Sequence, residues 1–374
     1  MSTVRVSDLI ERAYDEVRPL NAQLELTYKC NLLCSFCYNA PKQLRELSGE
    51  QWIAALDKLQ AAGVFTVTLT GGEPMCHREY FDIAQAVRDR ALVLKTYTNG
   101  VLLADRETAE RYAALAPFDT EISLHGADAA THDRLTGIGG SFDKLLIALG
   151  HLSDLGLKVT LKTPITRLNQ AQLREIEQLG ARLGYRVTFD TNITPTDDGD
   201  LSPLSLAADR EFMVEFFVDQ VRRGARGLNP RPVTKMKQNC GTGRVGLTID
   251  PYGQIFPCVA WRRPVANILD IDDLAALWRG PNETLDYVRK VAEEVPQTTL
   301  VKHEEAAFAS FCPAVAEKET GDPYAFYEAA RVSGLTRLEA QRRLEGGKTA
   351  LRKSQGCRGK DTGCALEDDG VKDR

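Results

Sequence analysis

Cys30-Asn-Leu-Leu-Cys34-Ser-Phe-Cys37 places three cysteines within eight positions, directly after the alternating apolar and polar residues of the run 23–27. Thiolates at positions i, i+4 and i+7 of one loop can bind three corners of a cubic iron–sulfur cluster. No fourth protein ligand stands nearby in the sequence, which leaves one iron open for substrate chemistry. We therefore predict an iron–sulfur site on a loop that leaves a strand.

A second motif, Thr70-Gly-Gly-Glu-Pro74, follows after about one strand and one helix. Paired glycines let a backbone approach a ligand closely. Together with Phe36 just before the last cysteine, the two motifs resemble those of the radical S-adenosylmethionine (radical SAM) enzymes. The resemblance implies a [4Fe–4S] cluster and bound S-adenosylmethionine. The residues implied at these two motifs are Cys30, Cys34 and Cys37 for the cluster, and Phe36, Gly71, Gly72 and Glu73 for the nucleotide, with the glycine motif contacting its methionine amino group.

The chemistry that the resemblance implies is a one-electron transfer from the reduced cluster into S-adenosylmethionine. It yields methionine and a 5'-deoxyadenosyl radical, which abstracts hydrogen from a substrate. One alternative for the three cysteines is a structural zinc site, although zinc normally completes a closed tetrahedron of Cys or His ligands. Another is a non-catalytic electron carrier or metal-storage protein, against which the glycine motif argues because a carrier does not need to bind a nucleotide.

Apolar runs of five to eight residues alternate with helical patterns along the first half of the chain. Ser48 with Gln51 forms a capping-box pattern for a helix over residues 49–62. Six strand–helix units in series predict an α/β fold, a parallel sheet that curls into a partial (β/α)6 barrel. The expected strands are residues 22–27, 64–70, 92–98, 118–124, 157–164 and 186–191.

Ligands of parallel barrels bind at the carboxyl ends of the strands, and every candidate motif falls there. Asn99 follows the third expected strand, and Ser123 ends the fourth. The resemblance implies that both lie near the nucleotide. His125 replaces an aspartate of many relatives, and a lone histidine is more often a packing residue than a proton carrier. Cys76 and His77 receive no role.

The second half contains a predicted hairpin around Asp250-Pro-Tyr-Gly253, whose flanks bring Cys240 and Cys258 together. This segment resembles the start of the SPASM extension, which binds auxiliary iron–sulfur clusters in relatives. Cys312 resembles a residue of the cysteine cluster that ends the extension, but the three cysteines expected before it are missing. The resemblance therefore implies one auxiliary cluster, on Cys240, Cys258 and Cys312.

The fourth ligand of that auxiliary cluster stays open. Candidates are His303, Cys357, Cys364 or an exogenous group. The alternative is that the extension is only a scaffold, with Cys312 an ordinary buried residue and the two later cysteines free thiols.

The chain has 374 residues, a formal net charge of -5 and nine cysteines, 43% of its residues are hydrophobic and 26% are charged. These values predict a globular protein without an electrostatic reason to bind nucleic acid or an anionic membrane. Neither a membrane span nor a signal peptide is visible, so we expect a cytoplasmic protein. The expected domains are an N-terminal helical segment (1–20), the barrel (21–225), the auxiliary-cluster extension (226–345) and a flexible tail (346–374).

Relatives with a barrel and such an extension mostly modify ribosomally made precursor peptides, forming crosslinks, thioethers or related oxidations. The resemblance therefore implies a precursor peptide as substrate and a reductant such as flavodoxin or ferredoxin as electron donor. A small-molecule substrate in cofactor biosynthesis, such as a tetrapyrrole, is the alternative. The segment before Ala22 is too short for a separate peptide-recognition domain.

Overall fold

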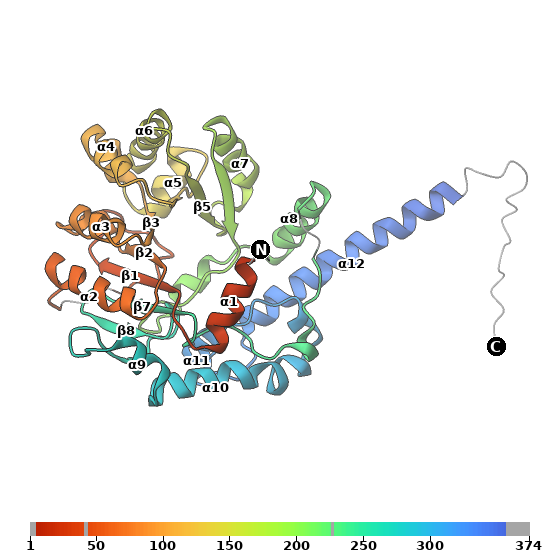
Figure 1. Ribbon diagram of the computed structural model, residues 1–374. Coiled ribbons are helices and arrows are strands. Elements are labelled where there is room, and N and C mark those ends of the chain that lie inside the picture. The colour runs from red at the N-terminus through yellow and green to blue at the C-terminus, as the bar shows by residue number, and fades with distance from the viewer. Residues whose placement is uncertain (1–4, 41–43, 226–227, 357–374) are drawn as a thin grey trace, which may run out of the picture.

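One nine-stranded sheet organises the computed structural model of this chain, which describes residues 5–40, 44–225 and 228–356. The strand order is β6-β5-β4-β3-β2-β1-β7-β8-β9 (Figure 1). The strands are β1 (Asn21–Thr27), β2 (Thr66–Gly71), β3 (Val93–Thr98), β4 (Asp119–Ser123), β5 (Thr160–Pro164), β6 (Arg186–Asp190), β7 (Gly246–Ile249), β8 (Gln254–Phe256) and β9 (Ala266–Asn267).

Strands β1 to β6 are parallel, and helices connect them in the alternating order of an α/β barrel. Figure 1 shows these helices following one another around one side of the curved sheet, which leaves the other side open as in a partial barrel. The predicted fold class is confirmed. The helices of this half are α1 (Val6–Asp15), α2 (Gly49–Ala61), α3 (Tyr80–Asp89), α4 (Arg106–Ala114), α5 (Ala129–Thr136), α6 (Ser141–Asp154), α7 (Leu173–Arg182) and α8 (Arg210–Arg222).

Helix α2 illustrates how local sequence sets these elements. The Ser48 side chain accepts the Gln51 backbone N–H, and the Gln51 side chain accepts the Ser48 N–H, so the predicted capping box is present. Trp52, Leu56 and Leu59 are fully buried against the sheet. The capped end and the apolar stripe fix the helix one residue shorter than predicted.

Four strands begin later than predicted: β4 begins one residue late, and β2, β3 and β5 begin late for one shared reason. Val64, Leu92 and Leu157 each donate their N–H to a carbonyl five residues earlier, at 2.9 to 3.2 Å. In each case the residue just before has a positive φ. These apolar residues therefore close Schellman motifs that end the preceding helices, and the strands start two or three residues on, except that β3 starts at the next residue.

The second half adds to the same sheet instead of forming a sheet of its own. Strand β7 pairs in parallel with β1, and β8 and β9 follow antiparallel. The hairpin predicted around 250–253 is confirmed: the Asp250 carboxylate accepts the N–H groups of Tyr252 and Gln254, and Gly253 has φ 84°. The remaining helices are α9 (Leu274–Arg279), α10 (Glu283–Thr298), α11 (Pro313–Thr320) and α12 (Glu328–Gly356).

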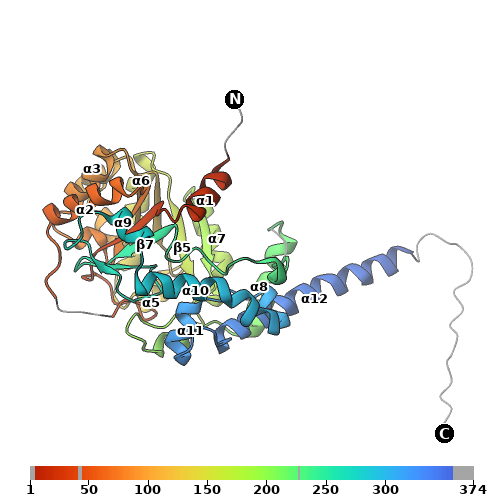
Figure 2. The ribbon, with the colours of Figure 1, turned by 60° about the horizontal axis from the view of Figure 1, so that its bottom comes forward.

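Helices α10 and α11 and the start of α12 enclose a second apolar core that includes Trp261, Val288 and Phe311. Figure 2 shows α12 passing α8 and extending away from the rest of the molecule. It continues beyond residue 346, the expected start of the tail. Cys357 and Cys364 lie outside the described residues. No helix in the described part of the chain is both long and apolar enough to cross a membrane.

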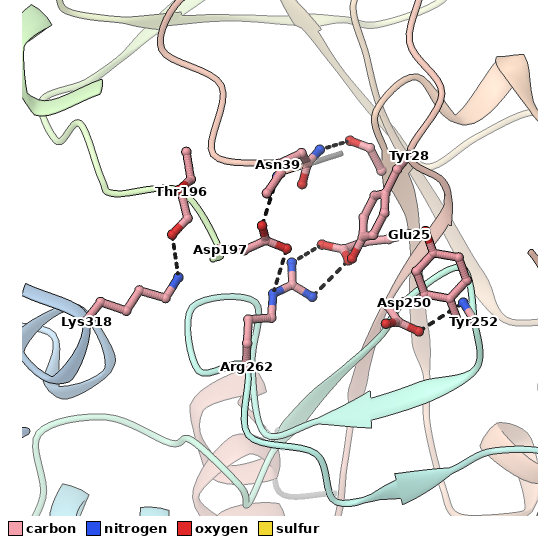
Figure 3. A network of polar contacts seen from close by, with 11 residues as sticks. Glu25, Tyr28, Asn39, Thr196, Asp197, Asp250, Tyr252, Arg262 and Lys318 are labelled. Carbon is pink, nitrogen blue, oxygen red and sulfur yellow. Dashed lines mark hydrogen bonds and ion pairs between the residues drawn. The ribbon is translucent and has the colours of Figure 1, made fainter. Parts of the chain in front are cut away.

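A buried ion pair joins the two halves. Arg262, on the loop after β8, donates from both terminal nitrogens to the carboxylate of Glu25 on β1, at 2.6 and 2.9 Å (Figure 3). The Tyr28 hydroxyl donates to the same carboxylate at 2.9 Å. The side chains of Glu25 and Arg262 are 0% and 8% exposed. Such a bidentate pair fixes both distance and orientation between the segments that carry it.

We expect Arg262→Met to lower the free energy of unfolding by about 3–5 kcal/mol, because it leaves the Glu25 carboxylate buried without a cation. The double variant Glu25→Leu, Arg262→Met should regain most of that loss, since it removes both charges. The measurement is anaerobic urea unfolding of the cluster-loaded protein. Equal destabilisation in the single and double variants would show that packing, not charge pairing, matters at this position.

Candidate functional site

The three-cysteine loop is fixed to the barrel by its backbone. The Leu33 N–H donates to the Thr136 carbonyl at 2.8 Å and the Ser35 N–H to the Leu135 carbonyl at 3.0 Å, so the loop is anchored on the end of α5. The Cys37 N–H donates to the Cys34 carbonyl at 3.1 Å, which closes a turn. The loop therefore holds its three sulfurs together at the carboxyl end of β1.

The sulfur atoms lie in surroundings suited to thiolates bound to a cation. Cys30 Sγ accepts the Leu32 N–H at 3.4 Å and the Asn99 side-chain amide at 3.7 Å. Burial, and then the charges of Cys37 and Cys30, raise the pKa of the Cys34 thiol to about 12. Three such thiols become thiolates together only when positive metal ions offset their mutual repulsion.

Within the described residues, no three His, Cys, Asp or Glu side chains surround a point that a single metal ion would occupy. A cubic cluster does not need that arrangement, because each thiolate binds a different iron. The donor set and the hydrogen bonds to Cys30 therefore fit a [4Fe–4S] cluster at Cys30, Cys34 and Cys37.

The glycine motif is tied to the cysteine loop through backbone bonds. The Gly72 N–H donates to the Thr27 carbonyl at 2.8 Å, and the Glu73 N–H donates to the Lys29 carbonyl at 2.9 Å. The Asn39 amide donates to the Gly71 carbonyl at 2.9 Å. A Cβ on Gly72 would lie 2.5 Å from the Lys29 carbonyl oxygen, so only glycine allows this close approach.

Glu73 is fully buried at the end of β2 and forms hydrogen bonds to the end of β3. Its carboxylate accepts the Thr98 hydroxyl at 2.9 Å, the Asn99 N–H at 2.8 Å and the Met75 N–H at 3.1 Å. Burial raises the pKa of Glu73 to about 7, although these donors oppose the shift. Its position connects the end of β2 to the Thr98-Asn99 turn after β3.

The other predicted nucleotide-site residues lie at the same edge. The Asn99 amide donates to Asn31 Oδ1 at 2.7 Å as well as facing Cys30. Ser123 is the last residue of β4 and is partly buried. The Phe36 ring contacts the His125 ring edge-on, with centroids 4.9 Å apart. All six lie at the carboxyl ends of β1 to β4, as predicted.

His125 is a packing residue in this structure. It is buried and stacks on His132, with centroids 5.4 Å apart. Burial, and then the charge of His132, lower the pKa of His125 to about 3. His125 is therefore neutral near pH 7 and does not act as a proton carrier there.

Cys76 and His77, which received no role from the sequence, differ from one another. Cys76 lies in the turn η1 (Pro74–Cys76). Burial, then the charge of Glu73 and then that of the nearby Cys30 raise the pKa of the Cys76 thiol to about 11. His77 is buried, with Nε2 on the Leu47 carbonyl and Nδ1 accepting the Glu79 N–H. A hollow of about 680 Å³ lies beside both residues.

The second group of cysteines is also brought together. Burial raises the pKa of the Cys312 thiol to about 11, and the nearby Cys258 and Cys240 raise it as well. Burial and Cys258 likewise raise the pKa of Cys240. Residues 72 positions apart in the chain thus gather beside the β7–β8 hairpin. His303, a predicted fourth-ligand candidate, stacks on Phe326 at 4.3 Å, and the contacts described for it do not involve these cysteines.

Sequence reasoning missed the polar network between the two cysteine groups (Figure 3). Asp197, on the loop after β6, accepts the Ala40 N–H at 2.9 Å and lies 3.9 Å from Arg262 Nε. Lys318 of α11 donates to the Thr196 carbonyl at 3.4 Å. The one signal for this network in the sequence was Glu25, a glutamate at an inward position of a buried strand. Arg262, Asp197 and Lys318 lie on segments whose contacts no local pattern predicts.

Comparisons with known proteins agree with this geometry. The family model for the radical SAM superfamily matches residues 24–180. The mycofactocin maturase MftC of Mycolicibacterium smegmatis is 33% identical over 270 residues, covering 68% of this chain and 67% of the relative. The sporulation killing factor maturation protein SkfB of Bacillus subtilis is 31% identical, covering 70% and 65%.

Solved structures share the fold at low sequence identity. Streptococcus suis SuiB bound to its precursor peptide SuiA has a TM-score of 0.66 and 17% identity, over 86% of this chain and 78% of that one. The enzyme anSMEcpe with AdoMet and a peptide has a TM-score of 0.66 and 13% identity, over 90% and 99%. This chain belongs to the radical SAM superfamily. Membership implies a [4Fe–4S] cluster and S-adenosylmethionine as its cofactors.

Gly72→Ala should weaken binding of S-adenosylmethionine by about tenfold or more, because the added Cβ displaces the backbone that joins the two motifs. Gly139→Ala is the matched control, since a Cβ there has open space around it. Equilibrium dialysis with labelled S-adenosylmethionine on protein of equal iron content measures the effect. Equal affinities for the two variants would separate the glycine motif from nucleotide binding.

Proposed function

We propose that this chain is a radical SAM maturase that modifies a ribosomally made precursor peptide by abstracting hydrogen from it. The observation that carries the proposal is the convergence of two cysteine groups on one strand, β1: Cys30 follows its carboxyl end, and the hairpin that leads to Cys258 extends the sheet from its edge. Two relatives named as a mycofactocin maturase and a sporulation killing factor maturation protein support the choice of substrate, and so does a structural neighbour that was solved with a precursor peptide.

The residues at the first site divide into ligands and positioning groups. Cys30, Cys34 and Cys37 are the ligands of the radical cluster. When bound, the cluster and S-adenosylmethionine supply a 5'-deoxyadenosyl radical that removes hydrogen from the substrate. Gly71 and Gly72 offer backbone atoms to the nucleotide, and Glu73 holds the β2 and β3 ends in register for it.

Phe36, Asn99 and Ser123 complete the proposed nucleotide site. Phe36, packed on His125, provides an apolar wall next to the cluster. Asn99 orients Cys30 and the loop through its amide, and Ser123 offers a hydroxyl at the end of β4. An apolar wall at this position would shield a reactive intermediate from solvent.

Cys240, Cys258 and Cys312 are the proposed ligands of one auxiliary iron–sulfur cluster. Their mutual proximity supports this role, and so does the short chain of contacts from Arg262, four residues after Cys258, to Glu25. Such a cluster would accept the electron left on the substrate after hydrogen abstraction. A small donor protein such as flavodoxin or ferredoxin would reduce the first cluster.

Cys34→Ala should abolish reductive cleavage of S-adenosylmethionine, because one ligand of the radical cluster is lost. Cys258→Ala should retain cleavage without substrate while losing most peptide conversion. Chromatographic assay of 5'-deoxyadenosine under strong reductant, with folding checked by circular dichroism, distinguishes the two. If both folded variants lose cleavage equally, the division into two sites is wrong.

Iron and sulfide analysis should give about eight irons per chain, falling to about four when Cys30, Cys34 and Cys37 are all replaced by alanine. Paramagnetic resonance should show a signal that responds to S-adenosylmethionine and is lost in that variant. About four irons falling to none would show that the second cysteine group is only a scaffold.

The substrate is tested by searching beside the gene for a short open reading frame and incubating its peptide product anaerobically with the protein. We expect a mass change in the peptide, coupled to formation of 5'-deoxyadenosine and measured by mass spectrometry. Co-purification of a tetrapyrrole, with no mass change in the peptide, would favour a small-molecule substrate instead.

A further inference from the structure

Lys318 lies beside the second cysteine group, close enough to Cys312 and Cys258 for their charges to act on it. It is on α11, which starts directly after Cys312, and its side chain reaches the loop that follows β6, where Nζ donates to the Thr196 carbonyl (Figure 3). The carboxylate of the next residue, Asp197, accepts the N–H of Ala40, and Ala40 lies three positions beyond Cys37. The ammonium group therefore lies on the loop after β6, which also contacts the segment that follows the first cysteine group.

The charge of Lys318 is not neutralised by an ion pair with any residue that the structure describes. Its neighbour Arg262, in contrast, places both terminal nitrogens on Glu25. An ammonium has three donors, and one hydrogen bond of 3.4 Å uses only one of them. Partial burial, and then the charge of Arg262, lower the pKa of Lys318. A partly buried cation in this state favours an anion as partner.

Three carboxylates near Lys318 already have other partners. Asp197, whose charge acts on Lys318, accepts the Ala40 N–H and lies 3.9 Å from Arg262 Nε. Glu317 accepts the Trp261 indole N–H at 2.6 Å and the Tyr287 hydroxyl at 2.9 Å, and it pairs with Arg263. Glu25 is occupied by Arg262 and Tyr28. With these three carboxylates engaged, an anionic group on an entering molecule can use the free donors of Lys318.

We propose that Lys318 binds a carboxylate of the peptide substrate, either the side chain of an aspartate or glutamate or the C-terminal carboxylate. This inference rests on the proposed function and adds to it a specificity residue. A carboxylate held at Lys318 fixes one end of the bound segment, so the carbon that loses hydrogen lies at a set distance along the peptide. Charge-assisted bonds of this kind shift affinity by about tenfold to a hundredfold.

The test uses immobilised, cluster-loaded, full-length protein and three pools of short peptides with the same random core. The first pool has a free C-terminal carboxylate and no acidic residue. The second is amidated at the C-terminus and contains aspartate or glutamate, and the third is amidated without either. Mass spectrometry quantifies the peptides retained under anaerobic conditions.

We expect the first or the second pool to be retained about tenfold more than the third, and the favoured pool identifies the source of the carboxylate. Lys318→Met should remove the difference while leaving the iron content unchanged, because methionine keeps most of the length of the side chain without its charge. Lys318→Arg should retain it. Lys290→Met is the matched control, because Lys290 lies on the exposed face of α10 with its side chain 70% exposed.

Three outcomes would overturn the inference. Equal retention of all pools by the wild type means that carboxylates are not recognised, although the peptide function would survive. Unchanged selectivity in Lys318→Met, with a shifted midpoint potential in a redox titration, means that Lys318 balances cluster charge instead. Retention of no pool at all means that the proposed peptide function itself fails.

Discussion

The buried contact between Glu25 and Arg262 is the constraint on which the arrangement of this protein depends. Two opposite charges withdrawn from water are stable only while they stay paired and correctly oriented. Glu25 lies five residues before the first cysteine of the barrel loop, and Arg262 lies four residues after Cys258. The pair therefore holds the barrel site and the extension site in one fixed relation, and the flanking polar network adds the loop after β6 to it.

The continuous sheet also fixes the two halves of the protein relative to each other. Because β7 pairs directly with β1, the second half is joined to the barrel by hydrogen bonds as well as by the connecting chain. These hydrogen bonds are made to the strand that precedes the cysteine loop. Radical chemistry benefits from such rigidity, since a reactive intermediate must meet its target before it meets solvent. The bonds from Gly72 and Glu73 to the end of β1 serve the same purpose on the other side.

The titratable groups near the two sites differ in how their charges are offset. Glu25 is neutralised by Arg262, His125 is neutral through burial, and Glu73 is held by three donors. Lys318 is a cation near these groups that no ion pair offsets within the part of the chain that the structure describes. A site in which the other charges are already satisfied and one cation remains is suited to recognising an anionic group on a substrate.

Sequence by itself determined the parts of this protein that depend on local pattern. These parts are the spacing of Cys30, Cys34 and Cys37, the glycine pair, the capping box at Ser48 and the alternation of strands and helices. They were enough to predict the fold class and to propose the first site. Even the boundary errors at Val64, Leu92 and Leu157 were local, because an apolar residue that closes a helix looks like the start of a strand. Only the tertiary structure decided that β7 joins β1, that Arg262 meets Glu25 from 237 positions away, and that Lys318 reaches the loop after β6. Those contacts depend on how whole elements pack, and no short stretch of sequence carries that information.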